Sequence, residues 1–168
     1  MIVTPAADST FRYSFYAGLV LTLLLGFWLT RLWGSENQVQ LHSNHFLHQI
    51  EERDWAGAGK FLAANYRDDW GNDRALMITR LRLGLRLFDR LTITAKEARI
   101  TLQASAVTWS GQIQVAGSGS EMAPAAIEEI NRLTTPFEFR WEKQSWKPWD
   151  WKLAKITNSE FQLPAQIY

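Results

Sequence analysis

Three histidines recur at every third residue in the segment that follows an apolar N-terminal stretch. His42, His45 and His48 are followed by Glu52, and imidazole and carboxylate groups at such spacing on a helix can bind a divalent metal ion. The apolar residues of the same segment, such as Phe46, define another face, so His45 and His48 are expected to point to solvent. A metal ion there would lack the outer shell that supports metal centres. We therefore expect no metal site and no cofactor.

The charged residues that acid–base catalysis would need fall on the outward side of the expected strands. Such catalysis requires a titratable side chain in an apolar pocket, where burial adjusts its pKa. Apolar and charged residues alternate in segments 137–142 and 149–153, so each strand has one apolar face. We expect no catalytic residue and an aromatic pocket instead. The residues expected to line this pocket are Tyr66, Trp70, Trp109, Phe139, Trp141 and Trp151.

An acidic pair lies between two of these pocket residues. Asp68 and Asp69 stand between Tyr66 and Trp70, where they would reach the mouth of the pocket. The run Asp-Asp-Trp-Gly-Asn at 68–72 is also typical of a turn that ends a helix, because Asp, Asn and Gly favour turn conformations. We expect a structural turn here.

The composition is that of an ordinary globular protein. Of the 168 residues, 46% are hydrophobic and 21% are charged, which excludes a disordered chain and a multi-span membrane protein. The absence of cysteine excludes disulfides and thiolate chemistry. Segment 34–73 is acidic and segment 74–99 is basic, so the two blocks balance. Because no nucleic-acid-binding motif accompanies the basic block, we expect no nucleic acid among the partners.

The N-terminal stretch is predicted to cross a lipid bilayer. No charged residue occurs from Tyr13 to Thr30, and Arg12 and Arg31 flank the apolar run. At about 1.5 Å per residue, a helix of this length reaches about 30 Å. A cleaved signal peptide is the main alternative, and it fits poorly because bulky Leu32 lies where small residues are needed. A buried soluble helix would show a polar face, which this stretch lacks.

The expected organisation is a short tail (1–12), a transmembrane helix (13–33), a globular domain (35–163) and a C-terminal tail (164–168). The positive charge of Arg12 and of the α-amine favours the inner side of a membrane for the short tail. We therefore expect a single-pass protein of the bacterial inner membrane with its domain in the periplasm.

Small residues are spaced by four along the predicted membrane helix. Such a ridge lets two helix backbones approach closely in a bilayer. We therefore expect self-association through this helix, besides its contact with lipid. The members of the ridge are Ser14, Gly18, Thr22, Gly26 and Thr30.

The globular domain is predicted to be of the α+β class. Apolar residues follow helical spacing in its first half and alternate in its second half. Asp54 suits the N-cap of the second helix, Ser35 with Gln38 suits a capping box of the first, and the run 117–120 is typical of a loop. The expected helices cover 35–53, 54–66 and 73–88, and a short helix begins at Pro124. The expected strand segments are 91–94, 100–102, 107–115, 137–142 and 149–153.

Three segments of the sequence resemble segments of the NTF2-like superfamily, which comprises cone-shaped domains of the SnoaL and ketosteroid-isomerase type. They are the helix end at 46–55, the second helix and exit loop at 63–70, and the closing hairpin at 139–161. The resemblance implies three helices packed on a curved antiparallel sheet, with a pocket at the open end of the cone. The superfamily includes isomerases, dehydratases, transport factors and scaffold subunits, so the fold does not settle the activity.

Two functions remain open at this point. The first is a membrane-anchored, non-catalytic binding or assembly module with an aromatic pocket. The order of tail, span and domain resembles the inner-membrane scaffold subunit of type IV secretion systems, which implies protein partners in a membrane assembly. The second is a lyase or isomerase that acts on an apolar small molecule in the cone.

Overall fold

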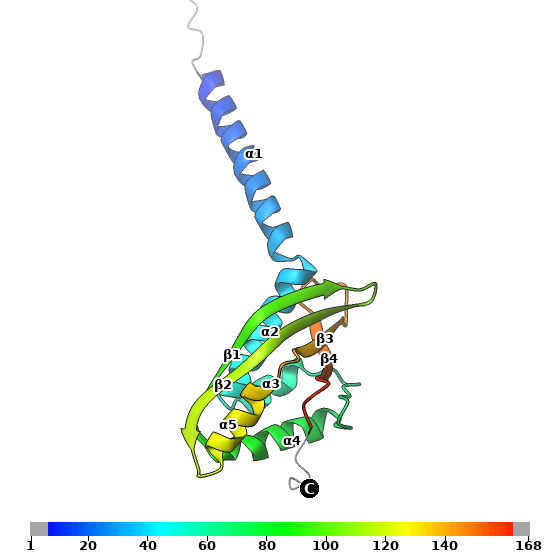
Figure 1. The fold of residues 1–168 in the computed structure, drawn as a ribbon. Helices are drawn as coiled ribbons and strands as arrows, with labels where there is room; N and C mark the ends of the chain where they lie inside the picture. Colours follow the sequence, from blue (N-terminus) through cyan, green and yellow to red (C-terminus); the bar gives the residue numbers. More distant parts are fainter. Residues whose placement is uncertain (1–6, 163–168) are drawn as a thin grey trace, which may run out of the picture.

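The computed structural model describes residues 7–162, without the side chains of residues 7–12, 30 and 32. The remaining parts of the expected tails, 1–6 and 163–168, lie outside the described residues. Figure 1 shows one long helix that stands away from a domain of helices and a curved sheet. The elements are α1 (Ala7–Leu32), α2 (Ser35–Glu51), α3 (Trp55–Phe61), α4 (Arg74–Gly84), a 3₁₀ turn (Leu85–Leu87), β1 (Phe88–Leu102), β2 (Ala106–Gly119), α5 (Ala123–Arg132), β3 (Phe137–Lys143) and β4 (Trp151–Thr157).

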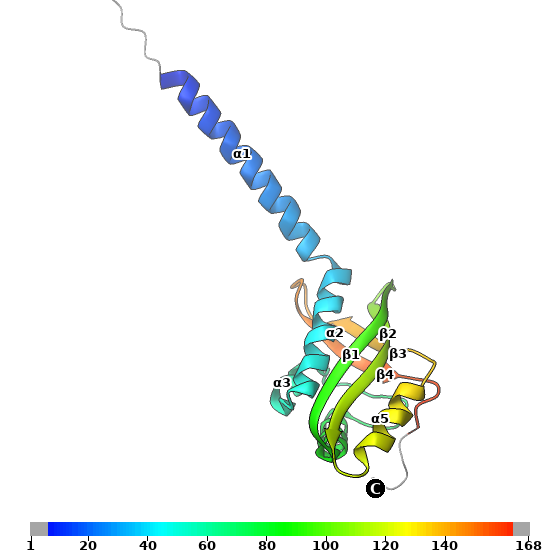
Figure 2. The same ribbon diagram turned by 60° about the vertical axis from the view of Figure 1, so that its left-hand side comes forward.

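The sheet is an antiparallel meander in the order β1-β2-β3-β4. Its long β1–β2 hairpin runs diagonally across α2, while α5 packs on β2 (Figure 2). In place of two short strands, β1 is a single long one whose register shifts between Lys96 and Arg99. Glu97 within this shift has a φ of 51°, as expected for a bulge that bends a strand around the domain.

Strand β2 extends into segment 117–120, which the sequence predicted to be a loop. The strand continues to Gly119 because Gly117 and Gly119 allow β1 to approach closely. A Cβ atom at Gly117 would collide with the carbonyl oxygen of Arg90, and one at Gly119 with that of Leu87. These glycines therefore serve a close backbone contact and not a turn.

One of the two predicted helix caps is confirmed, because Asp54 accepts a hydrogen bond from the backbone N–H of Gly57 at 2.8 Å. Asp73, which was not predicted as a cap, accepts one from the backbone N–H of Leu76 at 2.8 Å. The expected capping box at Ser35 is wrong, because Gly34 is the N-cap of α2 and makes no side-chain cap bond. Helix α3 also ends at Phe61, earlier than expected, and an extended segment follows.

The core forms where α2 crosses the inner face of the sheet. Val39 and Phe46 of α2 are fully buried, as are Trp109 and Trp141 on the sheet. Trp109 stacks on Phe139 with ring centroids 4.7 Å apart. The alternation of apolar residues in β3 and β4 thus predicted the buried face of these strands.

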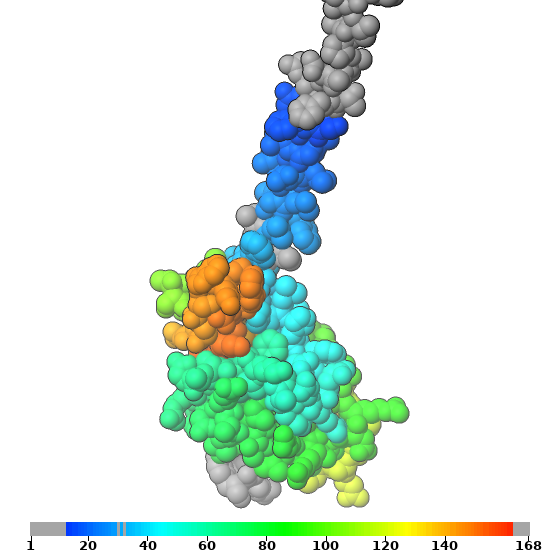
Figure 3. Space-filling model, turned by 180° about the vertical axis from the view of Figure 1, so that it is seen from behind, coloured from blue at the N-terminus to red at the C-terminus, as the bar shows by residue number. Residues whose placement is uncertain are grey.

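Helix α1 projects from the domain (Figures 1 and 3), and most of its described side chains are exposed. Leu23 and Leu24 are 64% and 62% exposed. The helix joins the domain through the turn at Gly34, where Asn37 Nδ2 also donates a hydrogen bond to the carbonyl of Arg31 at 2.6 Å. Across the part of the chain that the structure describes, no helix combines the length and the apolar character that a membrane crossing demands.

Candidate functional site

The domain contains an apolar cavity of about 360 Å³ between α2, α4, α5 and the inner face of the sheet. This volume lies within the range of about 300–1,000 Å³ that is common for small-molecule sites. Helix α2 contributes Phe46 and Ile50, α4 contributes Met77 and Leu81, and α5 contributes Ile130. Residues of all four strands and of the C-terminal segment complete the wall.

The cavity exists because α4 covers the sheet without packing tightly against it. No residue of α4 is buried, although Met77 and Leu81 face the core. Ile93 and Ile113 on the sheet are likewise only partly buried. Apolar side chains around a void lose dispersion contacts, which an apolar guest restores. The site is therefore suited to a molecule that is itself largely apolar.

Two of the six residues expected to line a pocket belong to this wall. Trp70 and Phe139 line the cavity. Trp70 is held in place because its Nε1 donates a hydrogen bond to the carbonyl of Phe161 at 2.8 Å, and the two rings meet edge to face. Sequence reasoning thus found one residue of the exit loop and one of the sheet.

The other four expected residues are buried in the packed core, outside the cavity wall. They are Tyr66, Trp109, Trp141 and Trp151, and each is at most 5% exposed. Trp141, for example, contacts the rings of Phe61 and His42 edge to face at 6.2 and 5.7 Å. Part of the inner face of the sheet packs into the core and part lines the cavity. The alternation of apolar and polar residues along a strand does not show which inward residues belong to each part.

Trp149 was expected on the same buried face and is not there. It is 54% exposed, because β4 begins only at Trp151 and Trp149 lies in the preceding turn. The pleat that would direct its side chain inward is absent at that position.

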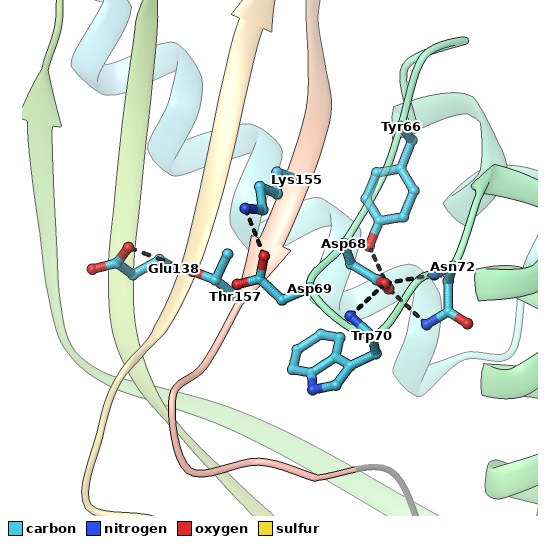
Figure 4. A network of polar contacts seen from close by, with 8 residues as sticks. All are labelled: Tyr66, Asp68, Asp69, Trp70, Asn72, Glu138, Lys155 and Thr157. Carbon is cyan, nitrogen blue, oxygen red and sulfur yellow. Dashed lines mark hydrogen bonds and ion pairs between the residues drawn. The ribbon is translucent and has the colours of Figure 1, made fainter.

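The acidic run 66–72 forms a hydrogen-bonded turn, as the sequence predicted (Figure 4). Asp68 Oδ1 accepts from the backbone N–H groups of Trp70 at 3.0 Å and Asn72 at 2.7 Å. Its Oδ2 accepts from the Tyr66 hydroxyl at 3.3 Å and from Asn72 Nδ2 at 2.7 Å. Burial, together with the charge of Asp68, raises the pKa of Tyr66, so this hydroxyl remains a donor. Asp69 points elsewhere and pairs with Lys155 at 2.6 Å.

Four residues bring polar groups to the cavity wall. Asn72 is 1% exposed, and its Oδ1 accepts no hydrogen bond from the described residues. Arg80 is half-buried, while Glu129 and Gln162 are exposed. Glu129 also lies 3.9 Å from Arg132, which places its carboxylate at the rim. The buried part of the wall is apolar apart from Asn72 and Nη1 of Arg80.

The histidines divide as the sequence predicted. His45 and His48 are exposed, and His48 lies 3.8 Å from Glu52. His42 is half-buried against Trp141, and its Nδ1 lies 2.7 Å from the carbonyl of Gln38. Desolvation lowers the pKa of His42. Within the described residues, no three His, Asp or Glu side chains converge in a way that would hold a metal ion.

Some of the missed residues of the cavity wall come from the two helices that cover it. Met77 and Leu81 on α4, and Ile130 on α5, lie in apolar stripes that the sequence does show. A stripe of this kind predicts an inward face. It carries no signal that distinguishes a tightly packed contact from the wall of a void.

Comparison with known proteins identifies the architecture. No family model matches the sequence, and no curated protein matches it significantly. A type 2 hexachlorocyclohexane dehydrochlorinase superposes with a TM-score of 0.57 and 12% identity, over 82% of this chain and 97% of that one. A putative dehydratase from the NTF2-like family of Streptomyces avermitilis gives 0.54 and 11%, over 73% and 93%. The fold is NTF2-like.

A third solved structure extends the comparison. A Bdellovibrio bacteriovorus protein gives a TM-score of 0.54 with 6% identity over 75% of this chain, and this chain spans 40% of its length. At such identities the likeness concerns the fold alone. The resemblance seen in the sequence is therefore confirmed for the α+β architecture, a meander sheet wrapped over helices.

Proposed function

We propose that this domain binds an apolar small molecule in the cavity without transforming it chemically. The observation that carries the proposal is the wall itself, in which aliphatic and aromatic side chains form most of the surface of a space of about 360 Å³. Its four polar residues are Asn72, Arg80, Glu129 and Gln162, of which the last two are exposed. Such a site supplies hydrophobic binding and shape, which recognition of an apolar molecule requires.

The experiment introduces a larger side chain on α4 that would occupy the cavity. It compares ligand affinity with that of a second variant on the same helix, whose larger side chain lies outside the cavity. The full chain in detergent is titrated with the neutral fluorophore 1-aminoanthracene. Leu81 lines the cavity and Leu83 is 41% exposed on α4 outside it. We expect Leu81→Trp to weaken binding at least tenfold and Leu83→Trp to leave it unchanged. Equal affinities for the two variants would contradict the proposal.

Tethering to a membrane is the second part of the proposal. Helix α1 has 26 residues, about 39 Å at 1.5 Å per residue, and its described side chains between Tyr13 and Leu29 are uncharged. No helix of the described residues is long and apolar enough to cross a membrane, and the side chains of residues 7–12, 30 and 32 lie outside the described part. We place the domain in the periplasm of a bacterium, as the position of Arg12 favours.

Self-association through α1 completes the arrangement. Gly18 and Gly26 have open space where a Cβ would lie, and Thr22 directs its hydroxyl to the carbonyl of Gly18 at 2.9 Å. Ser14 is exposed on the same helix, and the side chain of Thr30 lies outside the described residues. Two copies would bring two cavities side by side in a membrane assembly, in which further protein partners can take part.

A lyase or isomerase is the alternative, and Glu129 is the observation that favours it. Glu129 lines the cavity, and a carboxylate beside a ligand is a possible general base. The two functions differ in the fate of the ligand. Under our proposal, apolar molecules that co-purify with the chain are recovered unchanged after incubation. A conversion that Glu129→Gln abolishes would favour the enzyme.

A further inference from the structure

The turn between β3 and β4, residues 144–150, carries two exposed tryptophans. Trp146 is 85% exposed, and Trp149 is more than half exposed. Among the aromatic side chains described in residues 35–162, these two are exposed and the rest are buried or half-buried. Single apolar residues are common on protein surfaces, whereas two large rings in one short turn indicate a contact with another apolar surface. We call segment 144–150 the tryptophan turn.

Hydrogen bonds give the tryptophan turn a defined backbone. The backbone N–H of Gln144 donates to the carbonyl of Asp150 at 2.9 Å, which closes the turn. The indole of Trp151, at the start of β4, donates to the carbonyl of Pro148 at 2.9 Å. The two exposed rings are therefore presented by an ordered turn that joins two strands of the sheet.

The tryptophan turn lies at the end of the domain from which α1 leaves. His42 forms a hydrogen bond with the backbone of Trp149, and it lies two helical turns after the start of α2, about 10 Å along the helix. The register of β2 with β3 places the turn beside the tip of the β1–β2 hairpin, where Leu102 is also exposed. Figure 3 shows the turn, in orange, next to the end of α1.

The charges around the two rings favour an anionic surface. Lys143 and Lys147 are exposed, whereas Asp150, the acid of the turn, is half-buried. Glu142, which precedes the turn, is paired with Arg140 on the same strand at 3.2 Å. Tryptophan rings prefer the headgroup level of a bilayer, and lysine ammonium groups are attracted to the phosphates of anionic lipids. The combination therefore matches the surface of a phospholipid membrane.

We infer that the tryptophan turn inserts Trp146 and Trp149 into the headgroup layer of the bilayer, as a second contact of the domain with the membrane. The inference rests on the proposed tether, because α1 would hold this end of the domain close to the lipid. Helices α4 and α5, which border the cavity, lie at the opposite end of the domain (Figure 1). The docked domain would thus turn its cavity toward the aqueous phase.

The test uses single fluorescent labels, which the absence of native cysteine allows. The full chain is reconstituted in vesicles of phosphatidylcholine and phosphatidylglycerol, with or without a lipid that carries a quenching nitroxide on its acyl chain. A nitrobenzoxadiazole label is attached at Gln144→Cys in the tryptophan turn, at Val20→Cys on α1, or at Ser118→Cys at the opposite end of the sheet. We expect quenching at positions 20 and 144, at least about twofold stronger than at position 118.

A pair of variants assigns the contact to the two rings. In the chain labelled at position 144, Trp146→Ser and Trp149→Ser together should lower the quenching to the level seen at position 118. Leu83→Ser, which removes an exposed apolar side chain on α4, should leave the quenching unchanged. Because all three side chains are exposed, their loss leaves the core intact, and circular dichroism checks this.

Each outcome decides a different statement. Quenching at position 20 without quenching at 144 would overturn the inference and leave the tether in place. Equal quenching at positions 144 and 118, or quenching at 144 that survives the loss of both tryptophans, would overturn it as well. Absence of quenching at position 20 would overturn the tether and the inference together. Binding of an apolar molecule in the cavity is tested separately and stands under each of these results.

Discussion

Asp68 fixes the turn that carries both Trp70 and Asn72 to the cavity. It is 7% exposed and accepts four hydrogen bonds, from Tyr66, from the backbone of Trp70 and twice from Asn72. Asp68→Ala leaves these donors unpaired, and we expect a loss of about 3 kcal/mol in the free energy of unfolding.

Asp69 is the matched control for this prediction. Its ion pair with Lys155 joins two partly exposed side chains, so Asp69→Ala should cost less than about 1 kcal/mol. Urea unfolding of the full chain measures both values. Similar midpoints for the two variants would contradict the structural role given to Asp68.

His42 makes the stability of the domain depend on pH. Desolvation is the main cause of its lowered pKa, and the positive charges of His45 and Lys152 lower it further. An unfolded histidine titrates near about pH 6.5, so below that pH the unfolded chain takes up a proton before the folded one does. Stability is therefore highest above about pH 6.5 and falls as the pH decreases toward the folded pKa.

A pair of histidine variants measures this effect. We expect the urea midpoint of the wild type to fall between pH 7.5 and pH 5.5. The fall should be smaller in His42→Gln, which cannot take up the proton. It should be nearly unchanged in His48→Gln, because that exposed side chain is not among the groups that shift the pKa of His42. A wild-type pH dependence in His42→Gln would remove His42 as its source.

At the scale of elements, the sequence indicates which residues point inward but not what they meet there. Alternation in β3 and β4 predicted the buried positions of Phe139 and Trp141, because a pleated strand alternates its faces. The stripe on α4 predicted that Leu81 points inward. Whether an inward residue meets a neighbour or a void depends on the distance between α4 and the sheet, which long-range packing sets. Hence four of the six expected pocket residues lie in the core.

Helix α1 offers an element-scale prediction about association. If two copies pair along the small-residue ridge, larger side chains at Gly18 and Gly26 will separate the backbones. We expect Gly18→Ile and Gly26→Ile each to reduce the signal of a bacterial membrane two-hybrid assay several-fold. Ala17→Ile, which adds similar bulk off the ridge, should leave the signal unchanged. No signal in the wild type, or equal reduction by all three changes, would exclude this ridge as the contact.

At the scale of the whole molecule, the tether and the orientation of the domain belong together. If α1 crosses the inner membrane with its N-terminus inside, a reporter fused after the last residue lies in the periplasm. We expect alkaline phosphatase to be active at that junction and a cytoplasm-only reporter to be inactive. The reverse pattern would place the domain in the cytoplasm, and recovery of both fusions in the soluble fraction would remove the membrane tether.

The occupancy of the cavity by an apolar molecule is tested most directly by locating one there. Crystals of the full chain soaked with 2-bromonaphthalene allow the bromine to be found from its anomalous scattering. We predict a peak inside the cavity, among Leu81, Ile93 and Phe139, and its loss in Leu81→Trp. A cavity without a peak in the wild type, with bromine found only on α1 or on the surface, would contradict the proposed function.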